Sequence, residues 1–388
     1  MLNSLKIQNF RSLKNLEIQK LGRVNLIVGK NNSGKSTVLE ALRVYAGNAK
    51  LSLLREISAG HNERYEIGKG DKNENGQPLR FQHFFYGRKF PIDDEDAIVI
   101  GELNSKNVLN IQHAYFLERE ESITDTDGDT RIAIRRRRIK KSAIPKTPEG
   151  TLLQALVISG KKKLKPSNIF LQKSSLVFGG SITPQEHIDP CSYVPTQIVS
   201  MDQIANDWDK IALSKFEEIA KKALRIIESD FEDIAFINRS EKNEDSPDQS
   251  ISRAAYVRLK GFEHPVPLNS MGEGMIRVLQ LILKLFQAEK GILLIDEFEN
   301  GLHYSVQQKI WSLVFELSEE LNIQVFATTH SWDCIQSFTS VAVERTDIDG
   351  VLFRVGRSIK KSDNGNIIAT VFDEDKLVRL TQADVEVR

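Results

Sequence analysis

Apolar residues recur along this chain at two spacings, which divide it into strands and helices. In the first fifty residues the strand-like runs SLKIQNF, NLEIQKL and RVNLIVG precede the helical pattern KSTVLEALRVYA. The alternation returns near residue 268, with a helix over 273–288, the strand GILLI, the helix SVQQKIWSLVFELSEE and the strands IQVFAT, GVLFRV and IIATVF. Strands that alternate with helices favour parallel pairing, so the pattern predicts an α/β fold.

The stretch between these two parts differs in composition and in its pattern of apolar residues. Polar turns such as GKGDKNENGQP and SEKNEDSPDQS separate short strands such as AIVIGEL, AYFLER and RIAIR, and a helical piece lies around DWDKIALSKFEEIAKKALRIIE. We therefore expect a core built from residues 1–47 and 266–388, carrying a large α+β insertion over 48–265. No sustained heptads occur in the insertion, which argues against a long coiled coil.

The charge balance excludes a globally basic protein. Lys+Arg and Asp+Glu both number 53, so any contact with nucleic acid must come from a local patch. The basic run RRRRIKK at 135–141 is a candidate patch for nucleic acid or a partner protein, although such runs are more often solvated surfaces.

The cysteines and the apolar stretches indicate whether the chain has disulfides, metal sites or membrane-spanning segments. Cys191 and Cys334 lie far apart without CxxC spacing, which disfavours a zinc site or a disulfide framework. The N-terminus lacks the pattern of a signal peptide, and no stretch approaches the ~18 apolar residues that span a bilayer. We expect a cytoplasmic protein that makes no membrane contact.

A phosphate-binding loop follows the first buried strand. Residues Gly29 to Ser36 read GKNNSGKS between the strand VNLIV and a helix, the context that this motif requires. In such loops the backbone amides surround the phosphates, the Lys35 ammonium reaches the β/γ oxygens and the Ser36 hydroxyl binds Mg²⁺. A chance glycine-rich turn is a poor alternative in this context. The residues expected around the nucleotide are Gly29, Asn31, Asn32, Ser33, Gly34, Lys35, Ser36 and Thr37.

Acidic residues at the end of a second buried strand complete this chemistry. GILLIDEFENG places Asp296 to hold Mg²⁺ and Glu297 to polarise an attacking water, whereas a solvated turn would be the alternative. The next strand, IQVFATTHS, delivers His330 at its carboxyl end, where open α/β sheets bind ligands. A lone histidine is usually only structural, but this position favours a γ-phosphate contact. Thr328 and Thr329 are interpreted as ordinary strand-end residues.

The segment SMGEG at 270–274 opens a helix with two glycines. Unpaired N–H groups at such a start form an anion site, to which Ser270, Gly272 and Gly274 would contribute. The alternative is a capping box, with Ser270 as N-cap and Glu273 at the third helical position.

Taken as a set, these motifs resemble a known family of ATPases. FRS (10–12), GKNNSGKS, SMGEG, LLIDEFENGLH and TTHS together look like the ABC-type ATPase heads of the RecF, chromosome-maintenance and OLD (overcoming lysogenization defect) proteins. The resemblance implies that two heads sandwich two ATP molecules, with SMGEG of one head touching the γ-phosphate held by the other. It also implies a homodimer or higher oligomer, an antiparallel N-terminal β-layer, and Arg11 beside the nucleotide.

Three further segments most resemble OLD-like bacterial ATPases, and these are ENGLHYSVQ, FFYGRKFP and the final VEVR. Such ATPases are often encoded beside a separate Toprim-type or other effector in phage-defence systems such as PARIS. After GVLFRVGRS only about thirty residues remain, against the ~100-residue scale of a domain, so we expect no nuclease domain in this chain. The Q-loop position of the family is not evident, with Gln82 and His83 as candidates.

The sequence therefore predicts a Mg²⁺-dependent ATPase with Glu297, Lys35 and His330 as catalytic residues. ATP would act as a clamp that holds or releases an effector nuclease in antiphage defence. The alternative is a RecF-like DNA-repair ATPase that binds duplex DNA. A transporter's nucleotide-binding subunit is disfavoured by the long interruption between the phosphate loop and SMGEG.

Overall fold

A six-stranded mixed sheet forms the centre of the molecule. The computed structural model describes residues 1–63, 80–91, 96–124, 130–145, 147–161, 165–171, 190–240 and 251–372. The strand order is β16-β15-β3-β14-β13-β9, and every neighbouring pair is parallel except β16 with β15. The strands are β3 (Val24–Val28), β9 (Cys191–Val194), β13 (Ile292–Ile295), β14 (Gln324–Thr329), β15 (Gly350–Arg357) and β16 (Ile367–Phe372). The predicted α/β fold is confirmed.

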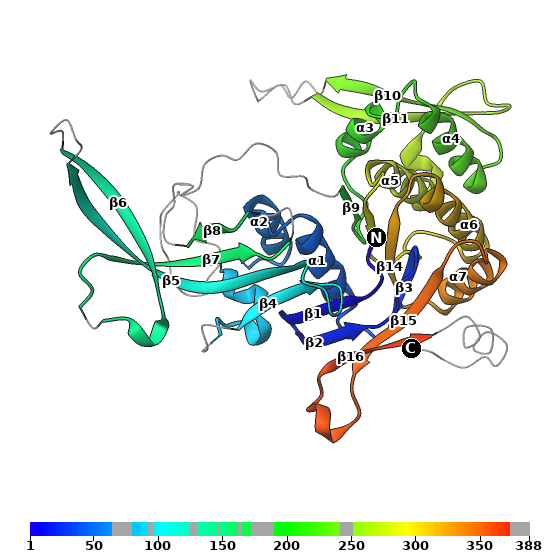
Figure 1. The fold of residues 1–388 in the computed structure, drawn as a ribbon. Coiled ribbons are helices and arrows are strands. Elements are labelled where there is room, and N and C mark those ends of the chain that lie inside the picture. The colour runs from blue at the N-terminus through cyan, green and yellow to red at the C-terminus, as the bar shows by residue number, and fades with distance from the viewer. Residues whose placement is uncertain are drawn as a thin grey trace.

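An antiparallel sheet lies beside the mixed sheet and continues the N-terminal strands (Figure 1). Its order is β2-β1-β4-β5-β7-β8, and β6 pairs with the distal part of β5. The strands are β1 (Leu5–Phe10), β2 (Leu13–Ile18), β4 (Ala97–Gly101), β5 (Val108–Thr124), β6 (Thr130–Ile139), β7 (Thr151–Ser159) and β8 (Ser167–Phe170). The expected antiparallel N-terminal layer is present.

Strand pairing crosses the expected boundaries of the insertion. β4 pairs with β1, and β9 pairs in parallel with β13 inside the mixed sheet. Residues 48–265 extend the N-terminal layer through β4 and also supply β9, an edge strand of the mixed sheet. The run CSYV is too short for its apolar pattern to reveal this role.

Alternate residues of the mixed sheet enter two hydrophobic cores. Leu26 and Val28 of β3 face one core with α5, α6 and α7, whereas Ile27 faces the other with α1 and the antiparallel sheet. The helices of the chain are α1 (Lys35–Ala46), α2 (Leu51–Gly60), α3 (Met201–Asp209), α4 (Lys215–Ile227), α5 (Glu273–Gln287), α6 (Tyr304–Glu320) and α7 (Trp332–Glu344). Helix α7 lies between two predicted strands and was not among the predicted helices.

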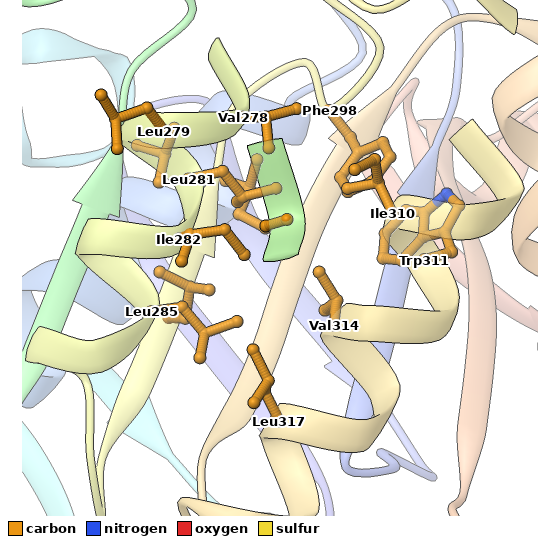
Figure 2. Packing of buried hydrophobic residues seen from close by; sticks show 14 of the residues in the cluster. Val278, Leu279, Leu281, Ile282, Leu285, Phe298, Ile310, Trp311, Val314 and Leu317 are labelled. Atoms are coloured by element: carbon orange, nitrogen blue, oxygen red, sulfur yellow. The ribbon is translucent and has the colours of Figure 1, made fainter. Parts of the chain in front are cut away.

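Helices α5 and α6 contribute apolar side chains to the same hydrophobic core. Figure 2 shows Val278 and Leu281 of α5 near Phe298, Ile310 and Trp311. The Phe298 and Trp311 rings stack with centroids 3.7 Å apart. Because full burial of such side chains contributes about 1.5–3 kcal/mol each, both helix starts are firmly held.

A smaller lobe covers α5. It contains α3, α4 and a three-stranded sheet of β10 (Phe231–Ser240), β11 (Ile251–Leu259) and β12 (Val266–Pro267). Short 3-10 helices occur at Phe81–Phe84, Tyr86–Arg88, Lys141–Ala143, Leu268–Met271 and Lys361–Asp363. None of the helices in the described part of the chain has the length and apolar character to cross a membrane. The final VEVR and most of the two polar turns quoted above lie outside the described residues.

Candidate active site

Four parallel strands end at one edge of the mixed sheet and deliver the polar residues of the site. β3 is followed by Gly29, β13 by Asp296, β9 by Pro195 and Thr196, and β14 by His330. Since the carboxyl ends of parallel strands share an edge, motifs far apart in sequence meet there.

The loop between β3 and α1 has the backbone that a phosphate loop needs. Gly34 caps α1 with φ 102°, and Gly29 has φ 151°, where a Cβ would collide with the carbonyl oxygen of Val355. Asn32 is left-handed at φ 60°. No side chain caps α1 and its first turn has no acidic residue, so its first N–H groups are free to bind an anion.

Lys35 lies folded against this loop. Its ammonium donates to the carbonyl oxygens of Gly29 at 2.7 Å and Lys30 at 3.2 Å. Burial lowers the pKa of Lys35, and the negative charges of Glu297 and Asp296 act in the opposite direction. The Lys35 ammonium is thus held beside the loop, close to the carboxylates of Asp296 and Glu297.

The rest of the loop divides into exposed and buried residues. Asn31 and Asn32 are exposed, whereas Ser33 is buried and its hydroxyl has no hydrogen-bond partner in the described part of the chain. Thr37 is half-buried, with Oγ1 3.4 Å from Ser12 Oγ. A buried hydroxyl without a partner is costly, so Ser33 is poised to bind a ligand.

Ser36 and Asp296 meet across the site, with the Ser36 hydroxyl donating to Asp296 Oδ1 at 3.2 Å. A hydroxyl and a carboxylate are hard oxygen donors, the kind that Mg²⁺ takes together with phosphate oxygens and waters. No cluster of three or more His, Cys, Asp or Glu side chains suited to a metal occurs within the described residues. Ser36 and Asp296 therefore fit a Mg²⁺ site that is completed by a bound nucleotide.

Thr328 organises both acids, a role that the sequence did not reveal. Its hydroxyl donates to Asp296 Oδ1 at 2.7 Å and accepts the backbone N–H of Glu297 at 2.8 Å. Thr196, just after β9, donates to Asp296 Oδ2 at 3.3 Å. Thr328 is fully buried, and a hydroxyl at the carboxyl end of a fully buried strand was the available signal.

Glu297 and His330 face each other at the mouth of the site. Glu297 has φ 50°, an unusual conformation for a non-glycine residue, and its Oε1 lies 3.5 Å from His330 Nδ1. The Glu297 side chain is 34% exposed and that of His330 is 48% exposed, so both remain accessible to a water or a ligand.

Glu299 is a second site residue that the sequence did not reveal. Its Oε1 accepts the backbone N–H groups of His330 at 3.0 Å and Ser331 at 3.1 Å, and lies 3.3 Å from His330 Nδ1. The Glu299 side chain is only 11% exposed. The third acid of DEFE therefore contacts the histidine loop at both backbone and ring.

Arg277 of α5 joins the backbone that carries Asp296 and Glu297 to the segment that follows β9. It is 2% exposed and donates to the carbonyl oxygens of Asp296 and Glu297, both at 2.9 Å, and to that of Pro195. Burial lowers the pKa of its guanidinium. An arginine on a buried helix face was the signal in the sequence, but only the fold identifies its partners.

The SMGEG segment forms an exposed turn followed by α5. Gly272 is the N-cap, with φ 85° and ψ 162°, and Ser270 lies in the preceding 3-10 helix. The capping-box alternative is wrong, because no side chain caps α5. A Cβ at Gly274 would lie 3.0 Å from Gly301 O, so that glycine permits close approach to the loop after β13. Within the described residues, no hydrogen bond joins this turn to the phosphate loop of the same chain.

Arg11 is held by carboxylates near the start of α1. Its Nε lies 2.7 Å from Glu40 Oε2 and its Nη1 lies 2.7 Å from Glu63 Oε1. The guanidinium also lies over the Phe84 ring at 4.9 Å. The residue expected beside the nucleotide is therefore engaged in a largely buried ion cluster in this structure.

The candidates for the Q-loop lie beside Arg11 rather than at Asp296. Gln82 and His83 belong to the 3-10 turn Phe81–Phe84, and Phe84 O accepts the backbone N–H of Arg11 at 2.9 Å. Burial lowers the pKa of His83. The segment that does reach Asp296 is Pro195–Thr196, because β9 ends next to β13.

Several known proteins are similar to this chain. A Helicobacter pylori protein named "ATP/GTP phosphatase" is 23% identical over 372 residues, covering 89% of each chain. The DNA replication and repair protein RecF of Clostridioides difficile is 46% identical over 41 residues, which is 11% of each chain. A Pyrococcus furiosus Smc head domain with an extended coiled coil, bound to the C-terminal domain of ScpA, aligns over 99% of both chains with a TM-score of 0.47 and 11% identity.

Two family models match this sequence. Residues 199–333 match the model described as "AAA domain, putative AbiEii toxin, Type IV TA system". Residues 1–254, more than half of the chain, match the model described as "AAA ATPase domain". The chain with this phosphate loop and these converging acids belongs to the AAA ATPase domain family.

Proposed function

We propose that this protein binds ATP with Mg²⁺ and hydrolyses it at the carboxyl edge of the mixed sheet. The observation that carries the proposal is the contact between Ser36 and Asp296, which joins the phosphate loop to the acid-bearing strand at 3.2 Å. The name of the Helicobacter pylori relative, an ATP/GTP phosphatase, supports the same chemistry.

Each polar residue has a definite task in this proposal. Amides of 29–37 bind phosphate oxygens, and Lys35 leaves its carbonyl partners to neutralise the β/γ oxygens. Ser36 and Asp296 would hold Mg²⁺, which would supply further positive charge against the phosphates. Glu297 orients and deprotonates the attacking water, and His330 contacts the γ-phosphate.

Dimerisation completes the site in this proposal. Ser270 and Gly272 are exposed, and their turn makes no hydrogen bond to the phosphate loop of its own chain within the described residues. We infer that Ser270, Gly272 and Gly274 contact the γ-phosphate held by a second copy, so that ATP closes a homodimer or a larger assembly.

The biological role that we propose is that of an OLD-like ATPase in antiphage defence, similar to the ATPase of PARIS. ATP binding holds, and hydrolysis releases, a separately encoded effector, a Toprim-type or other nuclease. We propose no nuclease activity for this chain.

The first test is the native mass of Glu297→Gln with and without Mg-ATP, after coexpression with the neighbouring gene product. The variant should bind ATP, fail to turn it over and accumulate as dimers, or multiples of dimers, that carry the effector. Lys35→Ala is the control and should lose nucleotide binding. A monomer under every condition would refute the trans arrangement, and near-normal hydrolysis by Glu297→Gln would remove that residue from its role as base.

A RecF-like DNA-repair ATPase is the second candidate. The local match to the Clostridioides difficile RecF favours it, although the match covers 41 residues only. An ATPase rate that duplex DNA stimulates in a salt-dependent way, with no effector bound, would select this alternative.

A further inference from the structure

A two-stranded β-ribbon extends from the antiparallel sheet. The pairing of β5 with β7 stops at Glu118, whereas the pairing with β6 continues to Thr124. Among the described strands, the distal parts of β5 and β6 therefore pair only with each other, and Figure 1 shows this hairpin projecting away from the rest of the molecule.

The register collects arginines on one face of the ribbon. Arg119 lies directly opposite Arg135, Leu117 lies opposite Arg137, and Ile123 lies opposite Arg131. Residues paired in this way share a face, as do positions two apart along a strand. We call Arg119, Arg131, Arg135 and Arg137 the basic face.

The opposite face is different in character. There Arg136 pairs with Glu118 at 2.7 Å and lies over the Phe170 ring, and Arg138 donates to Gln112 at 2.7 Å. Ile132 and Ile134 also lie on this face and are 70% and 57% exposed. The excess of positive charge on the ribbon strands is thus confined to the basic face.

Folding alone does not favour the basic face. Like charges directly opposite one another across two strands are destabilising. Arg119 and Arg135 have Glu149 and Glu121 as partners at 3.4 and 3.0 Å, but these pairs are exposed and contribute little. Arg131 and Arg137 have no ion-pair partner among the described residues. An anionic ligand would relieve this repulsion.

We propose that the basic face binds the phosphate backbone of duplex DNA. Arg131 to Arg137 covers about 20 Å of strand, a linear array that suits a regular polyanion. One strand of a DNA duplex presents a phosphate roughly every 3.4 Å along its axis. A two-stranded ribbon also fits the major groove of B-form DNA, whereas the deep, narrow major groove of A-form RNA does not admit it.

Duplex DNA fits better than a single strand. Proteins that hold single strands without sequence preference stack the bases on aromatic side chains. Between Leu117 and Ser122 of β5 and between Arg131 and Ile139 of β6 there is no aromatic residue. Tyr115, opposite Ile139, lies on the same face at the base of the ribbon, and beyond it the ribbon offers charges for a backbone and no aromatic platform for bases.

The test is binding of the full-length protein to a fluorescent 30-base-pair duplex over a range of salt concentrations. Arg137→Glu, alone and combined with Arg131→Glu, is compared with Arg138→Glu. The control makes the same charge change on the neighbouring residue of the opposite face. Arg131→Glu/Arg137→Glu should weaken binding by about tenfold or more and reduce the salt slope by about two. Arg138→Glu should change the affinity by less than about twofold at ~0.15 M salt, because exposed charges more than a Debye length of about 8 Å from the phosphates are largely screened.

Three outcomes would overturn the proposal. These are no binding of the duplex by the wild-type protein, an equal loss in Arg137→Glu and Arg138→Glu, and equal affinity for a single strand of the same length. ATP hydrolysis and thermal unfolding of each variant establish that the fold is intact, because the ribbon lies outside the candidate active site. The proposal does not depend on the proposed ATPase cycle.

Discussion

The Glu299 carboxylate accepts the backbone N–H of His330 at 3.0 Å and lies 3.3 Å from its Nδ1. One largely buried acid therefore contacts both the loop and the ring of the histidine that faces Glu297. If Glu299 affects hydrolysis only by positioning His330, removing Glu299 should have no effect on the rate once His330 is absent.

A double-mutant cycle tests this dependence. If His330 acts in hydrolysis as proposed, Glu299→Ala should lower kcat by about tenfold, equivalent to ~1.4 kcal/mol, with little change in ATP affinity. In a His330→Ala background the same change should have almost no further effect on kcat. Additive losses would show that Glu299 acts independently of His330, whereas no loss in His330→Ala alone would refute the role of the histidine.

Thr328→Val tests the hydroxyl that joins the two acids. The change keeps the shape but leaves the Glu297 N–H without its partner, so the free energy of unfolding should fall by about 1–3 kcal/mol. The Mg²⁺ concentration needed for half-maximal hydrolysis should also rise, because Asp296 loses a positioning bond. Urea unfolding measures the free energy of unfolding, and a Mg²⁺ titration of the ATPase rate measures the Mg²⁺ requirement.

Thr339→Val is the matched control. Thr339 is buried and its hydroxyl donates to Ile335 O at 2.8 Å within α7, away from the acids. It should alter stability only slightly and leave the Mg²⁺ dependence unchanged. The same Mg²⁺ shift in both variants would contradict the role given to Thr328.

Arg277→Met should be among the most destabilising changes in the chain. It removes the donor to carbonyl oxygens of Asp296, Glu297 and Pro195, and loss of bonds to a buried charged group leaves polar atoms unsatisfied at roughly 1–3 kcal/mol each. Gln280→Met, on the same buried helix face, breaks one long bond to Val199 at 3.4 Å. Urea unfolding should therefore separate the two variants, and equal stability would mean that Arg277 is not a structural tie.

The pair of His61 and Glu40 makes part of the stability depend on pH. The hydrogen bond to Glu40 raises the pKa of His61 above its ordinary value of 6.5. Because the pKa of His61 is raised in the folded state, the pair's contribution to the free energy of unfolding is fully present below pH ~6.5. It is lost as the pH rises through the folded-state pKa. The difference in stability between wild type and His61→Gln should therefore be larger at pH 6 than at pH 8.5, by thermal unfolding. A pH-independent difference would contradict this assignment.

Much of the site was evident before folding because its parts are local. GKNNSGKS, flanked by a strand and a helix, fixes the positions of Lys35 and Ser36 within a few residues of Gly29, and α1 begins at Lys35 as predicted. The strand GILLI likewise delivers Asp296, and IQVFATTHS delivers His330. Each of these predictions depends on a short strand and the loop that follows it.

Residues whose role depends on a distant partner were missed, or have contacts that the sequence did not reveal. Glu299, Thr328 and Arg277 carry ordinary side chains whose roles come from contacts across 19 to 82 positions of sequence. β9 was hidden because four residues carry too little pattern to reveal a strand, and Thr196 follows from it. Arg11 was expected beside a nucleotide, and only the packing of α1 and α2 brings Glu40 and Glu63 to it.

The sequence by itself determined the phosphate loop, the acid-bearing strand and the α/β alternation, because backbone geometry links these to residues nearby in the chain. Only the tertiary structure decided which strand lies beside β13, which side chains hold the acids, and which face of the β5–β6 ribbon is basic. The physical reason is that hydrogen bonds and ion pairs depend on distances of about 3 Å between atoms, and only chain packing sets those distances for residues far apart in sequence.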